Sequence, residues 1–150
     1  MNLKTAEVVA NKLMKEFNVP KGWTFRFNNR KRSLGLCCYT TKTVELSRDF
    51  VRLNERSEIE DTIRHEIAHA LVGPGHGHDA VWKRMAVRCG ANPRACKRVD
   101  KQAKGKYTLM FGNEEVEQLH RRPKWINRVQ DISISGRPET KGKLTLVRNY

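Results

Sequence analysis

The segment His65-Glu66-Ile67-Ala68-His69 constrains the fold of this chain more than any other feature. On an α-helix, residues four positions apart project from the same face, so the two imidazoles can bind one metal ion. Zinc binds imidazole nitrogen at about 2.0 to 2.1 Å, and a carboxylate beside it can deprotonate an attacking water. The segment therefore predicts a helix with His65 and His69 as zinc ligands and Glu66 as the general base of a peptidase. A buried histidine pair satisfied by backbone carbonyls is the alternative.

Local signals mark where this helix begins and ends. Ser57 and Glu60 have the spacing of a capping box, in which each side chain accepts a hydrogen bond from a backbone N–H near the helix start. Glycine and proline at residues 73–75 end the helix, which gives it about sixteen residues. An apolar stripe faces the core, with the two histidines on roughly the opposite side. The stripe consists of Ile59, Ile63, Ile67 and Leu71.

The loop after this helix supplies two candidates for a third zinc ligand, His76 and His78. A catalytic zinc ion usually has three protein ligands, so one of them is needed. His78 stands at the start of a second predicted helix, where packing of Val81, Trp82 and Met85 can fix its ring. His76 lies between two glycines that leave its backbone loose. We favour His78; His76 then contacts a ligand or the substrate, or is a solvated loop residue.

The remaining periodicities predict an α+β chain. The expected elements of the first hundred residues are a helix, three short strands and a further helix, over residues 3–17, 23–27, 35–40, 43–46 and 79–89. We expect the histidine-bearing helix to pack on a small three-stranded sheet. Residues 1–100 then form a catalytic domain, and residues 101–150 a small C-terminal β appendage. At 150 residues the chain can bury one proper core and is too short for two large domains.

The strong positive charge indicates a polyanionic partner. The chain has 30 Lys and Arg against 16 Asp and Glu, a formal net charge of +14, and such a field attracts nucleic acid in a salt-dependent way. Cations are dense after the histidine-rich loop, and later three of them flank a tryptophan, a composition suited to phosphate contact with base stacking. The candidate DNA-binding residues are Arg94, Lys97, Arg98, Arg121, Arg122, Lys124 and Trp125. A solvated basic surface is the alternative.

Cysteine usage and hydropathy indicate an intracellular, cytoplasmic protein. The four cysteines lack the C-x-x-C spacing of zinc knuckles, so we expect reduced, mostly buried thiols. They are Cys37, Cys38, Cys89 and Cys96. No apolar run approaches the roughly twenty residues that span a bilayer, and the amphipathic helix within residues 1–19 lacks a signal-type apolar block. We therefore expect no membrane partner.

Several segments together resemble the SprT-like zinc metalloprotease domain, the family of Spartan. They are residues 23–28, 30–37, 44–47 and 61–71, and His78 with Trp82 and Lys83. The resemblance covers about residues 3–98 and implies a zincin-like catalytic domain. In this family the histidine four residues before an aromatic residue is the third zinc ligand, which implies His78, ahead of Trp82. The resemblance also implies Glu66 as general base and proteins bound or crosslinked to DNA as substrates.

The last third of the chain departs from the family pattern. Many SprT-like proteins carry a C-terminal zinc ribbon with two C-x-x-C knuckles; here the flanks at residues 106–113 and 142–147 are kept, but the cysteines are missing. We therefore expect residues 101–150 to form a degenerate, metal-free β-hairpin. In place of thiolates, apolar side chains would hold it together. These are Phe111, Leu119, Trp125, Ile132 and Leu144.

The function that follows is a zinc-dependent endopeptidase acting on DNA-associated or DNA-crosslinked proteins. His65, His69 and His78 would bind one Zn²⁺ ion, and Glu66 would take the proton of the attacking water and later protonate the leaving amine. Two alternatives stay open. One is a DNA-binding module whose zinc is structural and whose protease activity has lapsed. The other is a dedicated processing protease that cleaves one protein partner without DNA.

Overall fold

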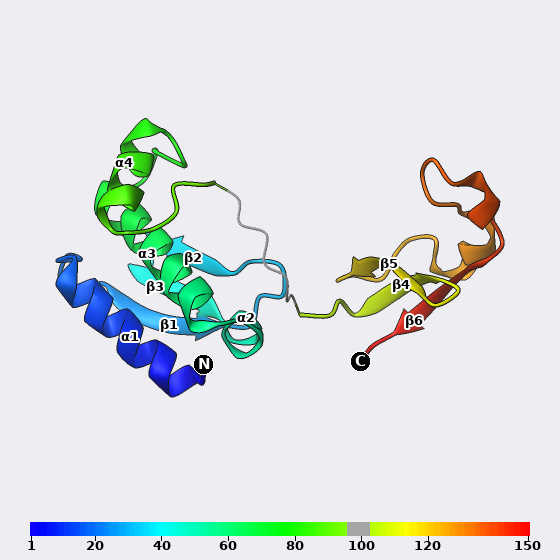
Figure 1. The fold of residues 1–150 in the computed structure, drawn as a ribbon, viewed down its shortest axis with the longest axis horizontal. Helices are drawn as coiled ribbons and strands as arrows, with labels where there is room; N and C mark the ends of the chain where they lie inside the picture. The colour runs from blue at the N-terminus through cyan, green and yellow to red at the C-terminus, as the bar shows by residue number, and fades with distance from the viewer. Residues whose placement is uncertain (96–102) are drawn as a thin grey trace. The chain divides into compact units, whose positions relative to one another are not determined.

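The computed structural model describes residues 1–95 and 103–150 of the chain (Figure 1). The chain divides into two compact units, Met1–Ala103 and Lys104–Tyr150, which are described separately. The described part of the first unit contains four α-helices and three strands, and that of the second contains three strands and two short 3-10 helices. The protein is therefore mixed α+β, as predicted. None of the helices described is both long and apolar enough to cross a membrane.

The first unit is built on one small sheet. Its elements in chain order are α1 (Leu3–Glu16), β1 (Thr24–Asn28), β2 (Gly35–Cys38), β3 (Thr43–Ser47), α2 (Arg48–Leu53), α3 (Arg56–Val72) and α4 (Ala80–Arg88). The strands lie in the order β1-β3-β2, and β3 pairs parallel with β1 and antiparallel with β2. The predicted three-stranded sheet is confirmed, and β2, which precedes the central strand in sequence, lies at its edge.

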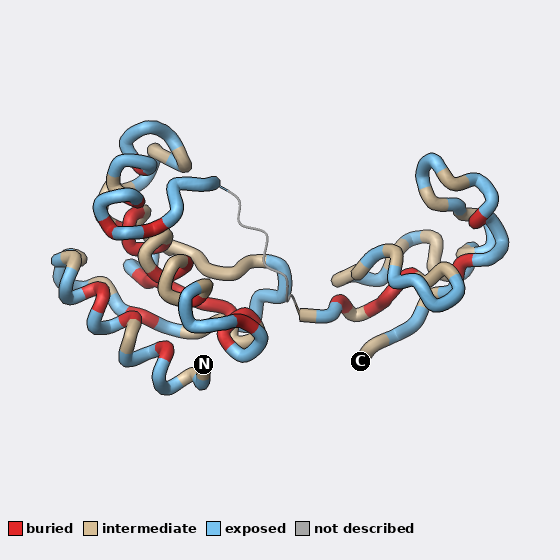
Figure 2. The backbone as a smooth tube through the Cα atoms, in the orientation of Figure 1, coloured by how far each residue is buried: buried red, intermediate tan, exposed pale blue. Residues whose placement is uncertain are grey.

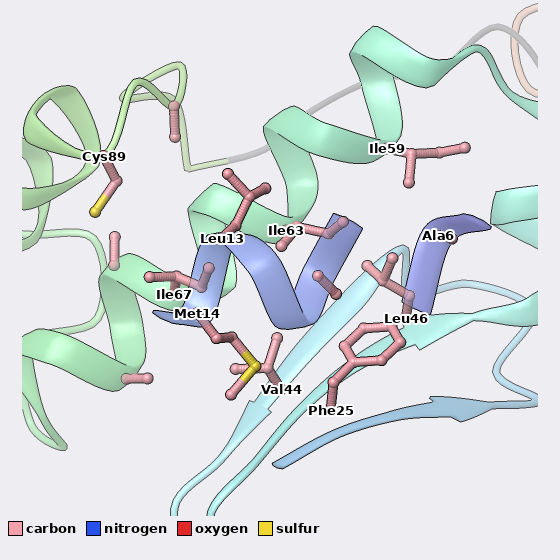
Figure 3. Packing of buried hydrophobic residues seen from close by; sticks show 14 of the residues in the cluster. Ala6, Leu13, Met14, Phe25, Val44, Leu46, Ile59, Ile63, Ile67 and Cys89 are labelled. Atoms are coloured by element: carbon pink, nitrogen blue, oxygen red, sulfur yellow. The ribbon is translucent and has the colours of Figure 1, made fainter. Parts of the chain in front are cut away.

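The core lies between this sheet and the two long helices, α1 and α3 (Figures 2 and 3). Successive residues of a strand point to opposite faces, and Val44 and Leu46 of β3 are fully buried on the face toward the helices. Ile59, Ile63 and Ile67 join them in one apolar cluster, at the helical spacing that the sequence predicted. One face of α3 is thus fixed on the sheet, and its histidines occupy positions off that face.

The start of α3 differs from the prediction. Its N-cap is Glu55, whose side chain makes no capping hydrogen bond, so the capping box predicted from Ser57 and Glu60 is wrong. Glu60 instead accepts hydrogen bonds from Arg56 at 2.6 Å and from Arg64 at 3.4 Å. These partners lie one turn before and one turn after it, where oppositely charged side chains stabilise a helix. The helix therefore begins one residue before Ser57.

A short helix that the sequence did not indicate, α2, directly follows β3. Ser47 caps it, because its Oγ accepts a hydrogen bond from the backbone N–H of Phe50 at 3.3 Å. Six residues are too few for a helical period to stand out, yet Phe50 and Val51 are both buried in the core. This helix leads the chain from the sheet to the start of α3.

In the second unit three strands form an antiparallel sheet in the order β5-β4-β6. Its elements are β4 (Tyr107–Phe111), β5 (Glu114–Leu119), the 3-10 helices η1 (Ile126–Asp131) and η2 (Pro138–Thr140), and β6 (Leu144–Arg148). The hairpin expected here thus gains a third strand on the other side of β4. Of the apolar residues expected to hold the unit, Leu144 is 1% exposed, whereas the other four are only partly buried.

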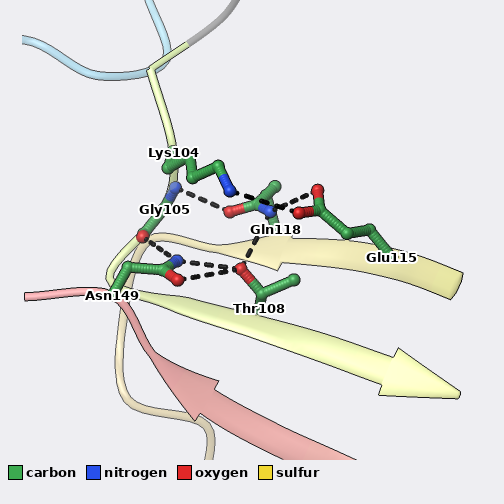
Figure 4. Close-up of polar contacts among 6 residues, drawn as sticks. All are labelled: Lys104, Gly105, Thr108, Glu115, Gln118 and Asn149. Atoms are coloured by element: carbon green, nitrogen blue, oxygen red, sulfur yellow. Dashed lines mark hydrogen bonds and ion pairs between the residues drawn. The ribbon is translucent and has the colours of Figure 1, made fainter. Parts of the chain in front are cut away.

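Polar side chains join the strands at one end of this sheet (Figure 4). The side-chain amide of Asn149 donates to the carbonyl oxygen of Gly105 at 2.7 Å and to Thr108 Oγ1 at 2.8 Å. Gln118 donates to the same hydroxyl at 2.9 Å, and its amide oxygen accepts from the Gly105 N–H at 2.9 Å. Thr108 is buried, so its hydroxyl has the partners that a buried polar group needs. From the sequence we expected apolar side chains alone to hold this unit together, and we did not predict these hydrogen bonds.

Candidate metal centre

Three histidine side chains meet beside the C-terminal half of α3. His65 and His69 lie one turn apart on this helix, and His78 lies just before α4. The Nε2 atom of His78 is 3.1 Å from Nε2 of His69 and 3.1 Å from Nε2 of His65. One ligand atom from each ring lies within 4.8 Å of the others. Across residues 1–95 and 103–150, this is the cluster whose side chains can hold a metal ion.

The spacing of these nitrogen atoms suits a tetrahedral metal ion. Ligand nitrogens about 2.0 to 2.1 Å from such an ion stand about 3.3 Å apart, close to the two distances of 3.1 Å between His78 and the pair on α3. A hydrogen-bond network fits less well, because one ring nitrogen carries either one proton or one lone pair and cannot fully satisfy two neighbours. Burial, with His78 nearby, lowers the pKa of His69 to about 4, and burial also lowers the pKa of His78. Neutral imidazole is the form that binds a metal.

The indole of Trp82 packs against all three rings. It is fully buried, and its ring centroid lies 4.6 Å from that of His65, 5.0 Å from that of His69 and 4.5 Å from that of His78. Asp79 caps α4, because its Oδ1 accepts from the backbone N–H of Trp82 at 3.0 Å. In the described part of the chain, Trp82 Nε1 has no hydrogen-bond partner. The indole therefore supports the histidines by packing.

His76, the other candidate for the third ligand, is engaged elsewhere. Its Nδ1 lies 2.9 Å from Oδ2 of Asp79, and it is not part of the cluster of convergent ligand atoms. The two oxygens of Asp79 thus serve two purposes, one capping α4 and the other holding this ring. The structure brings His78, and not His76, to the pair on α3.

Glu66 is buried between α3 and the edge strand β2. It is 8% exposed, and its carboxylate accepts a hydrogen bond from the backbone N–H of Cys37. Burial raises the pKa of Glu66 to about 8, although the Cys37 N–H acts in the opposite direction. A cation held by the neighbouring histidines would lower this pKa through its charge. Glu66 is therefore suited to taking and returning a proton near neutral pH.

Gly35 on β2 makes room for this carboxylate. A Cβ atom at Gly35 would lie 2.7 Å from Oε1 of Glu66 and 3.0 Å from Cγ2 of Thr62, so β2 can approach α3 this closely only with glycine here. No role was predicted for Gly35, although a glycine inside a strand is a signal of close backbone approach. Tyr39, just after β2, was also missed: its hydroxyl contacts two backbone carbonyls at the end of α3.

The residues predicted to bind DNA are divided between the two units. Those that are exposed are Arg94 in the first unit and Arg121, Arg122 and Lys124 in the second. Trp125 is partly buried directly before η1, so its ring is not fully available for stacking. Lys97 and Arg98 lie outside the described residues.

Comparison with known proteins gives one consistent match. The sequence profile of the SprT-like family matches residues 6–102, a range that contains α3 and all three histidines. Two proteins named Protein SprT-like, from Bacillus cereus (strain AH187) and Bacillus thuringiensis subsp. konkukian (strain 97-27), are each 26% identical to this chain over 136 residues. The aligned region covers 88% of this chain and 87% of each relative. No solved structure gives a significant match.

Proposed function

Because this chain belongs to the SprT-like family, we propose that it is a zinc-dependent endopeptidase with a zincin-like catalytic unit. The observation that carries the proposal is the convergence of three Nε2 atoms, with the buried Glu66 directly after His65 in the chain. Three imidazoles leave one position of a tetrahedral ion for water or substrate, as a catalytic zinc site requires. His65, His69 and His78 hold one Zn²⁺ ion in this proposal.

The mechanism is hydrolysis of a peptide bond with Glu66 as general base. Bound zinc supplies polarisation of the scissile carbonyl and acidification of water. Glu66 accepts the proton of the attacking water and later delivers it to the leaving amine. Its burial limits competing hydration of the carboxylate, and the N–H of Cys37 together with the close contact at Gly35 fixes where its oxygens lie. Trp82 supports the three imidazoles by packing against each of their rings.

The proposed substrates are proteins bound or crosslinked to DNA. The net charge of +14 supports an encounter with nucleic acid, and the exposed cations Arg94, Arg121, Arg122 and Lys124 are the proposed phosphate contacts. Binding to DNA would then select the substrate by proximity. Free thiols at Cys37, Cys38 and Cys89 are compatible with action inside the cell; Cys96 lies outside the described residues.

The test compares the wild type with Glu66→Gln, using a DNA-binding protein as substrate, with and without DNA. Glu55→Gln is the matched control, because Glu55 is an exposed carboxylate at the N-cap of the same helix. We expect the wild type and the control to release fragments, and Glu66→Gln to lose cleavage by at least about a hundredfold while retaining zinc. Equal fragments from the wild type and Glu66→Gln would exclude the assignment of the base.

The same experiment separates the two alternatives. A DNA-binding module with lapsed activity would bind DNA and zinc, and its wild type would release no fragments. A processing protease that works without DNA would cleave one protein partner at a rate that neither DNA nor moderate salt changes. For the proposed function we expect cleavage to rise with DNA and to fall steeply as salt weakens the phosphate contacts.

A further inference from the structure

The hydroxyl of Tyr39 connects the end of the edge strand β2 to the last turn of α3. Its Oη lies 3.0 Å from the carbonyl oxygen of His69 and 3.1 Å from the carbonyl oxygen of Gly73. The backbone N–H of Gly73 also donates to the carbonyl of His69, at 3.1 Å. A single side chain on the β2–β3 hairpin therefore contacts the backbone of His69, a proposed zinc ligand, and that of Gly73. Gly73 is the first residue of the return loop, which leads from α3 to Asp79.

The return loop from Gly73 to Asp79 has few other anchors. Gly73, Gly75 and Gly77 all have positive φ, and a Cβ atom added at any of them would meet nothing within 4 Å. The loop backbone is therefore not packed at its glycines. At its far end, Asp79 is held as the cap of α4. At its near end, the loop is held by the hydrogen bonds of Tyr39 to the carbonyl oxygens of His69 and Gly73.

A direct role in catalysis fits this hydroxyl less well. A phenol has one proton, and here the hydroxyl lies against two backbone carbonyls and also interacts with the thiol of Cys37, which leaves no proton for a developing oxyanion. The ring also packs edge-on against Trp23, with centroids 6.0 Å apart, so the side chain is held on both its apolar and its polar parts. Tyr39 is thus placed to act through the backbone that it contacts.

We propose that Tyr39 is a positioning residue that fixes the end of α3 relative to the return loop, so that His69 and His78 stand at the spacing a zinc ion requires. This inference rests on the proposed function, since it assigns Tyr39 to the same metal site. Its physical basis is that a metal ligand whose backbone loses a supporting hydrogen bond is less well positioned, although its side chain can still bind the metal. Such changes typically weaken metal affinity about 10- to 100-fold.

The test is the isosteric change Tyr39→Phe, which removes one oxygen and keeps the ring. Thr41→Val is the matched control, because it removes a hydroxyl from the same hairpin whose partner is Thr43 at 2.8 Å. Zinc dissociation constants come from competition with a chelator and need no turnover. We expect Tyr39→Phe to bind zinc about tenfold more weakly than the wild type, and Thr41→Val to match the wild type within about twofold.

Two further measurements separate positioning from other roles. At saturating zinc, kcat of Tyr39→Phe should stay within about threefold of the wild-type value. In the metal-free protein, amide exchange should accelerate at Gly73 while the amides of Ile63 and Ile67 keep wild-type rates.

Several results would overturn the proposal. One is unchanged zinc affinity; another is a fall in kcat at saturating zinc with unchanged affinity, which would make Tyr39 a catalytic residue. Faster exchange along the whole of α3 would indicate a merely structural role and would also overturn it. Absence of cleavage by the wild type would contradict the proposed function instead, and the zinc comparison would still decide the role of Tyr39.

Discussion

Replacing Glu66 by glutamine in the metal-free protein should change its stability in a pH-dependent manner. Burial raises the pKa of Glu66 from 4.5 to about 8, so the folded state favours the protonated carboxyl. The free energy of unfolding of the wild type should therefore fall, relative to that of Glu66→Gln, as the pH rises from 4.5 through the folded-state pKa. Glutamine has no such dependence, because it is neutral at every pH and has nearly the same shape.

The size of the effect follows from the pKa shift. One pKa unit corresponds to about 1.4 kcal/mol, and Glu66 is 8% exposed, so little of the effect is lost to solvent screening. The difference between the two proteins should reach about 3 kcal/mol at neutral pH. It should level off at about 5 kcal/mol above the folded-state pKa, and it should vanish well below the unfolded-state pKa.

Urea unfolding followed by the helical circular dichroism signal measures this difference, because α1 to α4 all belong to the first unit. All other titratable groups are the same in both proteins, so their contribution cancels in the comparison. Glu55→Gln controls for the loss of one exposed carboxylate. Saturating zinc should flatten the wild-type curve, since a nearby cation favours the ionised carboxylate. A difference between wild type and Glu66→Gln that stays constant from about pH 5 to about pH 8 would refute the burial argument.

Substitutions at three further positions test other parts of the structure. Gly35→Ala places a Cβ 2.7 Å from Oε1 of Glu66 and should displace this carboxylate. We expect kcat to fall by about tenfold or more in a cleavage assay. Zinc affinity, measured by competition with a chelator, should be unchanged. Asp79→Ala removes the cap of α4 and should lower the free energy of unfolding, measured in urea, by about 1 kcal/mol. Asp79→Asn can still cap the helix and should retain most of this stability. Leu144→Ala truncates a residue that is 1% exposed and should destabilise the second unit by about 2 to 5 kcal/mol, seen as faster amide exchange in β4.

The parts of the fold that the sequence predicted well are those with a local period. The apolar stripe Ile59, Ile63 and Ile67 identified the buried face of α3, because a repeat near 3.6 residues is a property of neighbouring positions alone. The start of this helix was predicted wrongly, since Ser57 and Glu60 match a capping box in sequence but lie inside the helix. The choice of cap depends on where the preceding chain ends, and here the chain leaving α2 places the N-cap at Glu55, two residues before Ser57.

The parts of the site that the sequence did not predict depend on β2. The strand order β1-β3-β2 places this strand at the edge and against α3, where Gly35 meets Glu66 and Tyr39 meets the carbonyl of His69. These partners are about thirty residues apart in the chain. No local pattern around either residue indicates what it will contact, because the contact exists only once the strand has paired with β3.

The sequence by itself determined which side chains share the candidate metal-binding face of α3, because helical geometry alone aligns residues four apart. It also narrowed the third ligand to two histidines, with His78 favoured by its place before α4. The tertiary structure decided what local geometry cannot: it brings His78 to the pair while Asp79 engages His76, and it buries Glu66 beneath β2. Both outcomes arise from contacts between separate elements, whose energies depend on packing and burial in the folded chain.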